Sequence, residues 1–181
     1  TPMALRKDAM LAATRIMQDV VAAAHRHPPH GRGTVGMVQV FPNSRNVIPG
    51  RVKFSIDLRN STDELVDAMA AEVKAFGDQV AKEQGARVHI EMVSSCPAQL
   101  FQPECVEAVG RAAAKLGYSH MPAVSGAGHD AVYMAKLAPS GMIFIPCKDG
   151  ISHNEIEDAK PEHIEAGCNV LLHAMLERAG T

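Results

Sequence analysis

The chain has 181 residues, of which 46% are hydrophobic and 21% charged, and its formal net charge is −2. This composition is typical of a soluble globular protein and allows one large domain or two small ones. The charge is small and no basic run is interleaved with its five Phe and two Tyr, which argues against a nucleic-acid surface. No segment is apolar over the roughly 18 residues of a membrane span. We therefore expect no nucleic-acid partner and no membrane partner.

The first residues, Thr1-Pro2-Met3, include no initiator methionine, and no signal peptide is recognisable. We therefore expect a terminus cut inside a longer protein. The four cysteines are widely spaced and form no CxxC pair. Reduced thiols are the simplest interpretation, and they indicate a cytoplasmic location.

In the first half of the chain, apolar residues recur at helical spacing from Leu5 to about Ala24, which predicts a helix with one buried face. Pro28-Pro29 ends this pattern. Residues 35–41 are a strand candidate, and the loop 42–50 follows with a turn at its end.

The clearest strand covers 52–58, where Val52, Phe54, Ile56 and Leu58 alternate with polar residues. A capping box at Ser61–Glu64 opens a second helix, which Gly85 ends. Residues 88–92 alternate again and predict a third strand. The order α-β-β-α-β indicates a βαββαβ unit that lacks its first strand, with an antiparallel sheet and two helices on one face.

In the second half, Pro103 begins a helix that reaches Leu116. A short strand at 121–124, a helix from Asp130 to about Lys136 and a strand at 142–146 follow. Pro161 opens a last helix, whose buried face is expected to carry Ile164, Cys168, Leu171 and Met175. This β-α-β pattern predicts part of a parallel sheet that lacks its other half. The fold class expected is thus α+β over residues 1–97 and α/β over residues 98–181.

Two histidines lie in glycine-bearing loops on either side of the strand predicted at 142–146, and loops at strand ends are where α/β proteins place their chemistry. Gly126 and Gly128 precede His129, where they would permit close approach of a ligand, and the N–H of His129 is suited to stabilising an oxyanion. For Asp130, a place in the first helical turn is favoured over a ligand role. His153 is suited to binding Zn²⁺ or a similar ion, but from the residues alone a surface histidine is slightly favoured, because one His makes no metal site.

Two residues of the first half are candidates for substrate contacts. Arg59 ends a strand on its polar face, where a guanidinium is suited to a bidentate bond with a carboxylate. A solvated pair with Asp57 or Glu64 explains it equally well. Asn46, in the long loop, is suited to bonding a substrate or its own turn. A cluster of His25, His27 and His30 is better explained by the helix dipole than by a metal.

Taken together, these motifs resemble N-carbamoyl-L-amino-acid hydrolases and their relatives, β-ureidopropionase and allantoate amidohydrolase, which are di-metal enzymes related to aminoacylase-type metallopeptidases. The resemblance rests on the loop Gly126–Asp130, the loop Gly150–Glu155, the stretch Asn46–Gly50 and the strand end Asp57–Arg59. It covers the whole chain but only the C-terminal half or less of such an enzyme.

The resemblance implies a ferredoxin-like lid and dimerisation domain over about 1–97, and the end of an α/β catalytic domain over about 98–181. It implies two divalent cations per active site (Zn, Mn, Co or Ni), with His153 as one ligand and most other ligands outside this chain. His129, Gly126 and Gly128 would contact the substrate, as would Asn46, and Arg59 would hold its carboxylate. The reaction implied is metal-assisted attack of water on a carbamoyl or ureido carbon.

Two interpretations follow from this resemblance. In one, the chain is part of a homodimeric enzyme that hydrolyses linear C–N bonds of a small carboxylate-bearing substrate, such as an N-carbamoyl-L-amino acid, N-carbamoyl-β-alanine or, alternatively, allantoate. In the other, the chain as given is only a lid and dimerisation module without turnover. Because most of the metal site is expected elsewhere, we expect the fragment to be inactive by itself.

Overall fold

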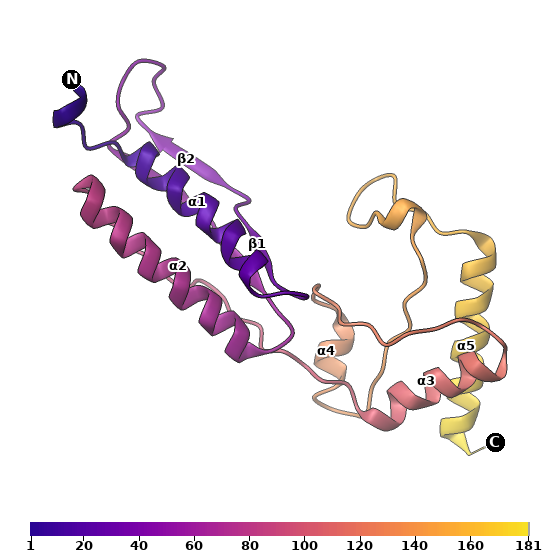
Figure 1. Cartoon of the computed structure of the whole chain (residues 1–181). Helices are drawn as coiled ribbons and strands as arrows, with labels where there is room; N and C mark the ends of the chain where they lie inside the picture. The colour runs from indigo at the N-terminus through magenta and orange to yellow at the C-terminus, as the bar shows by residue number, and fades with distance from the viewer. Residues whose placement is uncertain (181) are drawn as a thin grey trace. The chain divides into compact units, whose positions relative to one another are not determined.

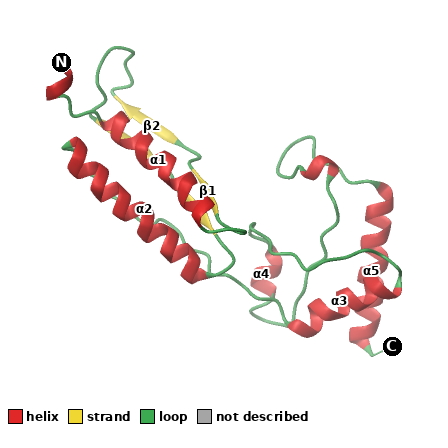
Figure 2. Cartoon of the chain, in the orientation of Figure 1, coloured by secondary structure: helices red, strands yellow, loops and turns green. Residues whose placement is uncertain are grey.

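The computed structural model describes residues 1–180 and mixes helices with short strands (Figures 1 and 2). It divides into two compact units, Thr1–Ala98 and Gln99–Thr181. No helix within the described residues combines the length and apolar character needed to cross a membrane. In chain order the elements are η1 (Met3–Leu5), α1 (Ala9–Arg26), β1 (Arg32–Thr34), β2 (Val38–Phe41), β3 (Arg51–Phe54), β4 (Asp57–Arg59), α2 (Asp63–Gln84), α3 (Pro103–Lys115), α4 (Asp130–Met134), η2 (Lys148–Gly150) and α5 (Pro161–Ala179).

The strands of the first unit form an antiparallel ribbon interrupted by a β-bulge. β2 pairs with β3 in the register Val38↔Phe54, and β1 pairs with β4 in the register Thr34↔Asp57. Residues 35–37 therefore face only residues 55 and 56, so one strand carries an extra residue. The strand predicted at 35–41 is broken for this reason, because the bulge changes which of its residues point inward.

The strand predicted at 52–58 keeps its alternation. Val52, Phe54, Ile56 and Leu58 are half-buried, while the residues between them are exposed. Pairing breaks within it as well, since β3 ends at Phe54 and β4 begins at Asp57. Across the gap, the Ser55 N–H donates to the Met37 carbonyl at 3.0 Å, which keeps the two halves in one ribbon.

The helices α1 and α2 pack side by side and against the ribbon (Figure 1). The buried core between them contains Ala12, Ile16, Val20, Ala23, Val73 and Val80. Burying each Val or Ile side chain of this kind stabilises the fold by roughly 1.5–3 kcal/mol. Phe54, Ile56 and Leu58 pack on the same core from the ribbon, which is why their face of the strand is apolar.

Local capping sets the ends of both helices. α1 begins at Ala9 rather than near Leu5, because Asp8 is its N-cap residue. The Asp8 carboxylate accepts a hydrogen bond from the Met10 amide at 2.9 Å. Leu5 lies outside this helix, in η1, with 72% of its surface exposed. α2 has Thr62 as its N-cap and ends at Gly85, whose φ of +59° lies in the left-handed region that suits glycine.

The strand predicted at 88–92 is not formed within the described residues. A strand requires hydrogen bonds to a neighbour, and residues 1–180 supply none for this segment. Val88 still packs on the core, close to Gly77 of α2, whereas Met92 is 74% exposed. Of the alternating residues Val88, Ile90 and Met92, only Val88 is therefore partly buried against the core as the pattern predicted.

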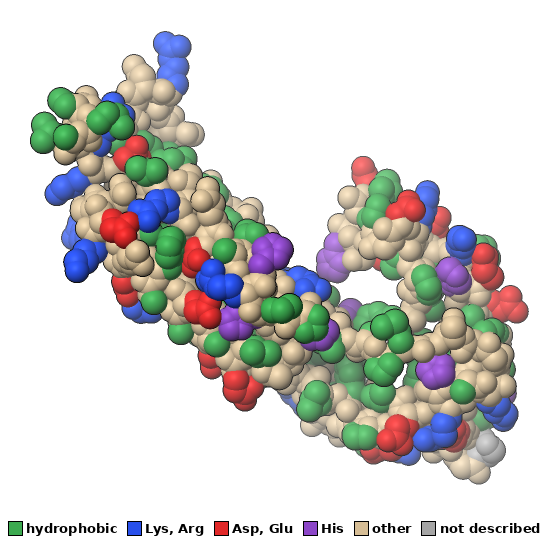
Figure 3. Space-filling view, viewed as in Figure 1, with side chains coloured by type: hydrophobic (Ala, Val, Ile, Leu, Met, Phe, Trp, Pro, Cys, Tyr) green, Lys and Arg blue, Asp and Glu red, His purple; other side chains and the backbone are tan. Residues whose placement is uncertain are grey.

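In the second unit, α3 packs against α5. Their contact buries Ala108, Ala112, Ala113, Val170 and Ala174. The face predicted to be buried on α5 is wrong: Ile164, Leu171 and Met175 are 48%, 50% and 61% exposed, and Cys168 is exposed too. The contact between α3 and α5 is made by smaller side chains, mostly alanines, because these let the two helices approach closely. Hydrophobic side chains consequently remain at the surface of this unit (Figure 3).

No strand is formed at 121–124 or 142–146, so the β-α-β part predicted for this unit is absent from the described residues. Each segment again lacks a hydrogen-bonded neighbour among them. α4 is also shorter than predicted and ends at Met134. Gln102, at the start of α3, is bonded to the residues that follow α4. Its side-chain oxygen accepts a hydrogen bond from the Ser140 amide at 2.7 Å, and its side-chain amide donates to the Ala135 carbonyl at 3.3 Å.

Candidate functional site

Arg59 lies on the polar face of β4 and pairs with Asp57 on the same face. Arg59 Nε donates to Asp57 Oδ1 at 2.8 Å, and Arg59 Nη2 donates to Asp57 Oδ2 at 2.8 Å. About half of each side chain is exposed, 49% for Arg59 and 50% for Asp57. Hydrogen bonding to Arg59 lowers the pKa of Asp57, and the same bond raises the pKa of Arg59.

The structure thus decides between the two acidic partners proposed for Arg59. Glu64 is engaged at the start of α2, where its own backbone amide and then the Thr62 hydroxyl lower its pKa. A substrate carboxylate at Arg59 would have to share the guanidinium with Asp57.

Directly across the ribbon from Arg59 lies Arg32, its register partner on β1. Residues directly opposed in an antiparallel pair point to the same face, with Cβ atoms about 4.5–5.5 Å apart, and like charges there repel. Arg32 Nη1 is anchored on the carbonyls of Pro29, at 3.1 Å, and Gly31, at 2.9 Å. Two guanidinium groups therefore share one exposed end of the ribbon. Sequence reasoning missed Arg32, because its nearness to Arg59 depends on the strand register.

Asn46 lies in the loop between β2 and β3, exposed to solvent. Its Oδ1 accepts a hydrogen bond from the Ser44 hydroxyl at 3.2 Å, so the side chain is bonded within its own turn. The loop is held from outside by the Ala9 amide, which donates to the Pro49 carbonyl at 3.1 Å.

The loop that carries Asn46 joins β2 to β3 at one end of the ribbon, and Arg59 ends β4 at the other. Residues 51–59 follow the strand direction at about 3.3 Å per residue, which separates the two ends by roughly 25 Å. The structure therefore does not bring these two predicted substrate contacts together within one copy of the chain.

His129 is the N-cap residue of α4, and its ring has two neighbours. Its Nε2 lies 2.8 Å from the Ser125 hydroxyl, and its ring meets Phe144 edge to face at 5.5 Å between centroids. The Ser125 oxygen also accepts the Ala127 amide at 3.2 Å. These contacts orient the imidazole. Sequence reasoning missed Ser125 as its partner, although a serine four residues before a histidine in a glycine loop was a visible signal.

The other residues of this loop have simpler roles. A Cβ built on Gly126 or Gly128 would meet no atom within 4 Å, so packing inside the chain does not require glycine at either position. Asp130 is the first residue of α4 and the acidic residue of its first turn, as expected from the sequence.

His153 lies exposed in the loop between η2 and α5, with a φ of +57°. Few residues other than glycine adopt this left-handed conformation. The His153 amide donates to Glu157 Oε2 at 2.9 Å, and the Lys148 amide donates to the Asp158 carbonyl at 2.7 Å, so the loop is closed by its own bonds. The two candidate histidines, His129 and His153, thus have different partners.

The described residues do not by themselves fit a metal ion. Within residues 1–180 no three His, Cys, Asp or Glu side chains are placed to hold one. Because a structural or catalytic zinc needs at least three protein ligands, His153 could be only one member of a set.

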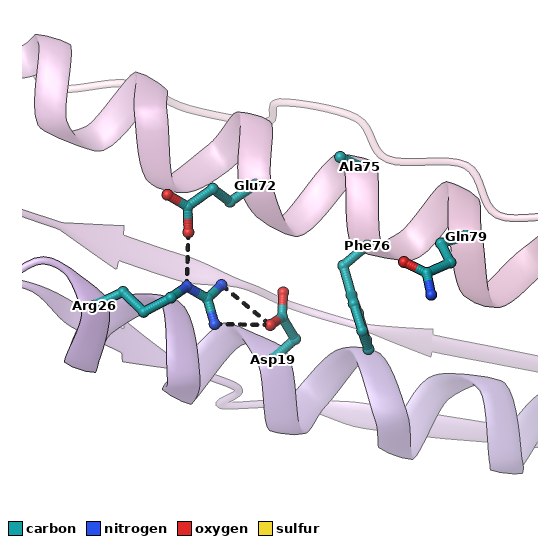
Figure 4. A pocket seen from close by; sticks show the side chains of 6 residues that line it. All are labelled: Asp19, Arg26, Glu72, Ala75, Phe76 and Gln79. Carbon is teal, nitrogen blue, oxygen red and sulfur yellow. Dashed lines mark hydrogen bonds and ion pairs between the residues drawn. The ribbon is translucent and has the colours of Figure 1, made fainter.

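A shallow, open depression of about 530 Å³ lies between α1 and α2, away from the predicted site residues (Figure 4). Arg26 spans it, with Nη1 at 3.1 Å from Asp19 Oδ1 and Nε at 2.9 Å from Glu72 Oε2. His27 Nε2 also lies 2.8 Å from Glu72 Oε1. Asp19 is only 9% exposed, so its pair with Arg26, within α1, compensates a buried charge. The pair between Arg26 and Glu72 links α1 to α2. Among the three clustered histidines, His27 therefore has a structural partner.

Comparison with known proteins places the chain in a family. It belongs to peptidase family M20/M25/M40, whose family model matches residues 7–177.

Within that family the resemblance to N-carbamoyl-L-amino-acid hydrolases is confirmed. The chain is 46% identical to an N-carbamoyl-L-amino-acid amidohydrolase of Rhizobium meliloti, over 99% of this chain and 43% of that protein. It is 30% identical to an allantoate amidohydrolase of Bacillus subtilis, over 99% of this chain and 43% of that protein. A crystal structure of an amidase of the hydantoinase/carbamoylase family from Burkholderia multivorans matches with a TM-score of 0.94 at 51% identity, over 99% of this chain and 44% of that one. The chain spans less than half the length of these relatives.

Proposed function

We propose that these residues form the C-terminal part of an amidohydrolase that cleaves a linear C–N bond of an N-carbamoyl-L-amino acid. The observation that carries this proposal is the 46% identity with the Rhizobium meliloti N-carbamoyl-L-amino-acid amidohydrolase along 99% of the chain. Allantoate and N-carbamoyl-β-alanine are the alternative substrates, of which the first is supported by the lower identity of 30% with an allantoate amidohydrolase. All three carry a carboxylate and a ureido group.

In this proposal Arg59 binds the substrate carboxylate. A planar guanidinium forms two parallel charge-assisted bonds with a carboxylate, and the exposed end of β4 makes Arg59 accessible to a small molecule. Neighbouring Arg32 adds positive charge to the same end of the ribbon.

The first unit acts as the lid and as the dimerisation domain. Asn46 and Arg59 are separated by far more than the length of an amino-acid-sized substrate. If both contact one substrate, they come from two copies of the chain, which a two-fold dimer provides. Exposed apolar residues along the ribbon support association, namely Met37 (45%), Val38 (45%), Phe41 (39%) and Val47 (49%). Sedimentation of the full-length protein should show a dimer, and a monomer at all concentrations would refute this part.

In the second unit, which we assign to the catalytic domain, His129 would contact the scissile group. Ser125 and Phe144 hold its ring in place, and an N–H of the imidazole would stabilise negative charge on the substrate oxygen. The space at Gly128, where an added Cβ would meet no atom within 4 Å, would let the substrate approach the backbone of this loop.

His153 would be one ligand of a pair of divalent cations, Zn, Mn, Co or Ni, whose other ligands lie outside this chain. The strained backbone at His153 supports a functional role, since such conformations cluster at functional sites. Because the described residues do not complete a metal site, no step of the reaction is assigned to the metals here.

The decisive experiment measures ammonia released by the full-length protein from N-carbamoyl-L-amino acids, N-carbamoyl-β-alanine and allantoate. The highest kcat/KM should be found for an N-carbamoyl-L-amino acid. A preference for allantoate would select the alternative substrate, and no ammonia from any of the three would refute the proposal.

The 181-residue chain alone tests the alternative of a module without turnover. Because it offers one candidate metal ligand, it should release no ammonia even when divalent metal is added. Turnover by this chain would show that the catalytic groups lie within it.

A further inference from the structure

The hydroxyl of Ser125 has three polar neighbours in its loop but only one proton to share among them. The Ala127 amide donates to Ser125 Oγ at 3.2 Å, which uses one of the two acceptor positions of the hydroxyl. The proton can then point to His129 Nε2, at 2.8 Å, or to the Ala127 carbonyl, at 3.4 Å. A hydroxyl usually donates over about 2.5–3.0 Å, so the histidine nitrogen is the better acceptor.

This hydrogen bond determines which nitrogen of the neutral His129 ring carries the proton. A neutral imidazole has one N–H and one acceptor nitrogen, so a ring that accepts at Nε2 carries its proton on Nδ1. In the reverse arrangement Nε2–H would donate to Ser125. Both acceptor positions of the hydroxyl would then be filled, and within the loop its own proton would have only the long contact with Ala127.

The Nδ1 atom of His129 is accessible within the part of the chain that the structure describes. The ring contacts the Ser125 hydroxyl through Nε2 and the Phe144 ring edge to face, and Nδ1 forms no hydrogen bond within residues 1–180. The buried side-chain nitrogen and oxygen atoms without a partner in this range are Asp19 Oδ2 and His163 Nδ1. The unpaired Nδ1 of the half-buried His129 is therefore not buried.

We propose that Ser125 is a positioning residue, whose hydroxyl keeps the His129 proton on Nδ1 and so makes Nδ1–H the donor to the negative oxygen of the reacting substrate. This inference rests on the proposed role of His129 at the scissile group. It adds which nitrogen acts and which residue selects it. A donor that is oriented in advance needs no reorganisation when charge develops on the substrate, which is why such donors are effective.

The first test replaces the His129 ring by side-chain amides in the full-length enzyme. The amide nitrogen of Asn lies close to the position of Nδ1, whereas that of Gln lies close to the position of Nε2. His129→Ala should lower kcat about a hundredfold, which is the usual cost of losing one such donor. His129→Asn should keep a kcat about tenfold above that of His129→Gln. An equal or higher kcat in His129→Gln would overturn the assignment of Nδ1.

The second test removes the Ser125 hydroxyl. Ser125→Ala should lower kcat about tenfold with little change in KM, because the donor acts in the transition state. Ser125→Thr, which keeps a hydroxyl on the same carbon, should recover most of this loss. In the His129→Asn background Ser125→Ala should have little further effect, since an amide has no tautomer to select.

Ser140→Ala is the matched control for the serine variants. It removes a hydroxyl of the same unit that donates to the Ala138 carbonyl at 2.9 Å, and it should leave kcat and KM unchanged.

Several results would contradict the role of Ser125. A wild-type kcat in Ser125→Ala would remove this residue from the site. A loss that persists in the His129→Asn background, or a lower metal content in Ser125→Ala, would indicate a structural role. A carbamoyl group found on Ser125 by mass spectrometry would make the hydroxyl a nucleophile, because a serine bonded to a histidine also suits that chemistry. If His129→Ala keeps the wild-type kcat, the proposed role of His129 fails first, and the histidine variants show this without the serine variants.

Discussion

Gly33 of β1 lies against the backbone carbonyl of Val20 in α1, so closely that a Cβ on this glycine would overlap the carbonyl oxygen. The same Cβ would lie 3.3 Å from the Ala24 side chain. Because both obstacles belong to a packed helix, they cannot move aside without shifting α1 from the core. This contact sets how closely the ribbon approaches the helix, and so places the end of β1 that carries Arg32.

Gly33→Ala should therefore destabilise the chain by about 1–3 kcal/mol, the usual cost of overpacking. Urea denaturation followed by circular dichroism measures this change. Gly50→Ala is the matched control, because a Cβ there meets nothing within 4 Å. Equal stability of the two variants would contradict the close approach of β1 to α1.

The link between Arg26, His27 and Glu72 predicts a pH dependence of stability. Hydrogen bonds from His27 and then Arg26 lower the pKa of Glu72 below its ordinary value of 4.5. A carboxyl with a lowered folded-state pKa stabilises the fold above its ordinary pKa, and this contribution is lost as the pH falls through the lowered value. The gain is modest because the Glu72 side chain is 39% exposed.

Glu72→Gln should lower the melting temperature at neutral pH, and the difference from wild type should shrink well below pH 4.5. Thermal unfolding across this range measures both effects. Asp78→Asn, in an exposed pair with Lys74, should change little at any pH. A difference between Glu72→Gln and wild type that is independent of pH would show that the ionised carboxylate is not what matters.

Arg59→Lys in the full-length enzyme keeps the charge but removes the fork geometry. If Arg59 binds the substrate carboxylate, kcat/KM should fall about tenfold or more, equivalent to roughly 1.4 kcal/mol. A surface pair with Asp57 alone would contribute roughly 0–1 kcal/mol to stability and leave the kinetics unchanged. A kcat/KM within about twofold of wild type, or roughly 0.4 kcal/mol, would rule out the carboxylate contact.

His153→Ala in the full-length enzyme should abolish turnover and lower the bound metal, measured by elemental analysis of the purified protein. A catalytic metal held by few protein ligands loses affinity when one is removed. His120→Ala is the control: this exposed histidine has its Nδ1 3.2 Å from the Tyr118 carbonyl. Full metal occupancy in His153→Ala would return His153 to a surface role.

The sequence by itself determined the features that depend on neighbours along the chain. Gly85 marks the end of α2, and the segment Ser61–Glu64 marks its start to within one residue, because a cap bonds to backbone groups of its own turn. The cap of α1 at Asp8 was missed, since the apolar spacing from Leu5 placed the start of that helix too early. The alternation over 52–58 identified the buried face of that strand, since the pleat repeats every second residue. The loops around His129 and His153, together with the stretch Asn46–Gly50 and the strand end Asp57–Arg59, were likewise enough to recognise the family that the comparisons confirm.

Only the tertiary structure decided what depends on distant partners. Periodicity at 88–92, 121–124 and 142–146 predicted strands, but a strand forms only where another segment supplies its hydrogen bonds, and residues 1–180 supply none there. The buried face of α5 was mispredicted for a related reason, because α3 packs on the small side chains of Val170 and Ala174 rather than on the larger residues of the helix. The strand register set Arg32 opposite Arg59, and the strand geometry put Asp57, two residues away on the same face, within bonding distance of Arg59. Pairing and packing join residues far apart in the chain, and a pattern read along it carries no information about which partner is present.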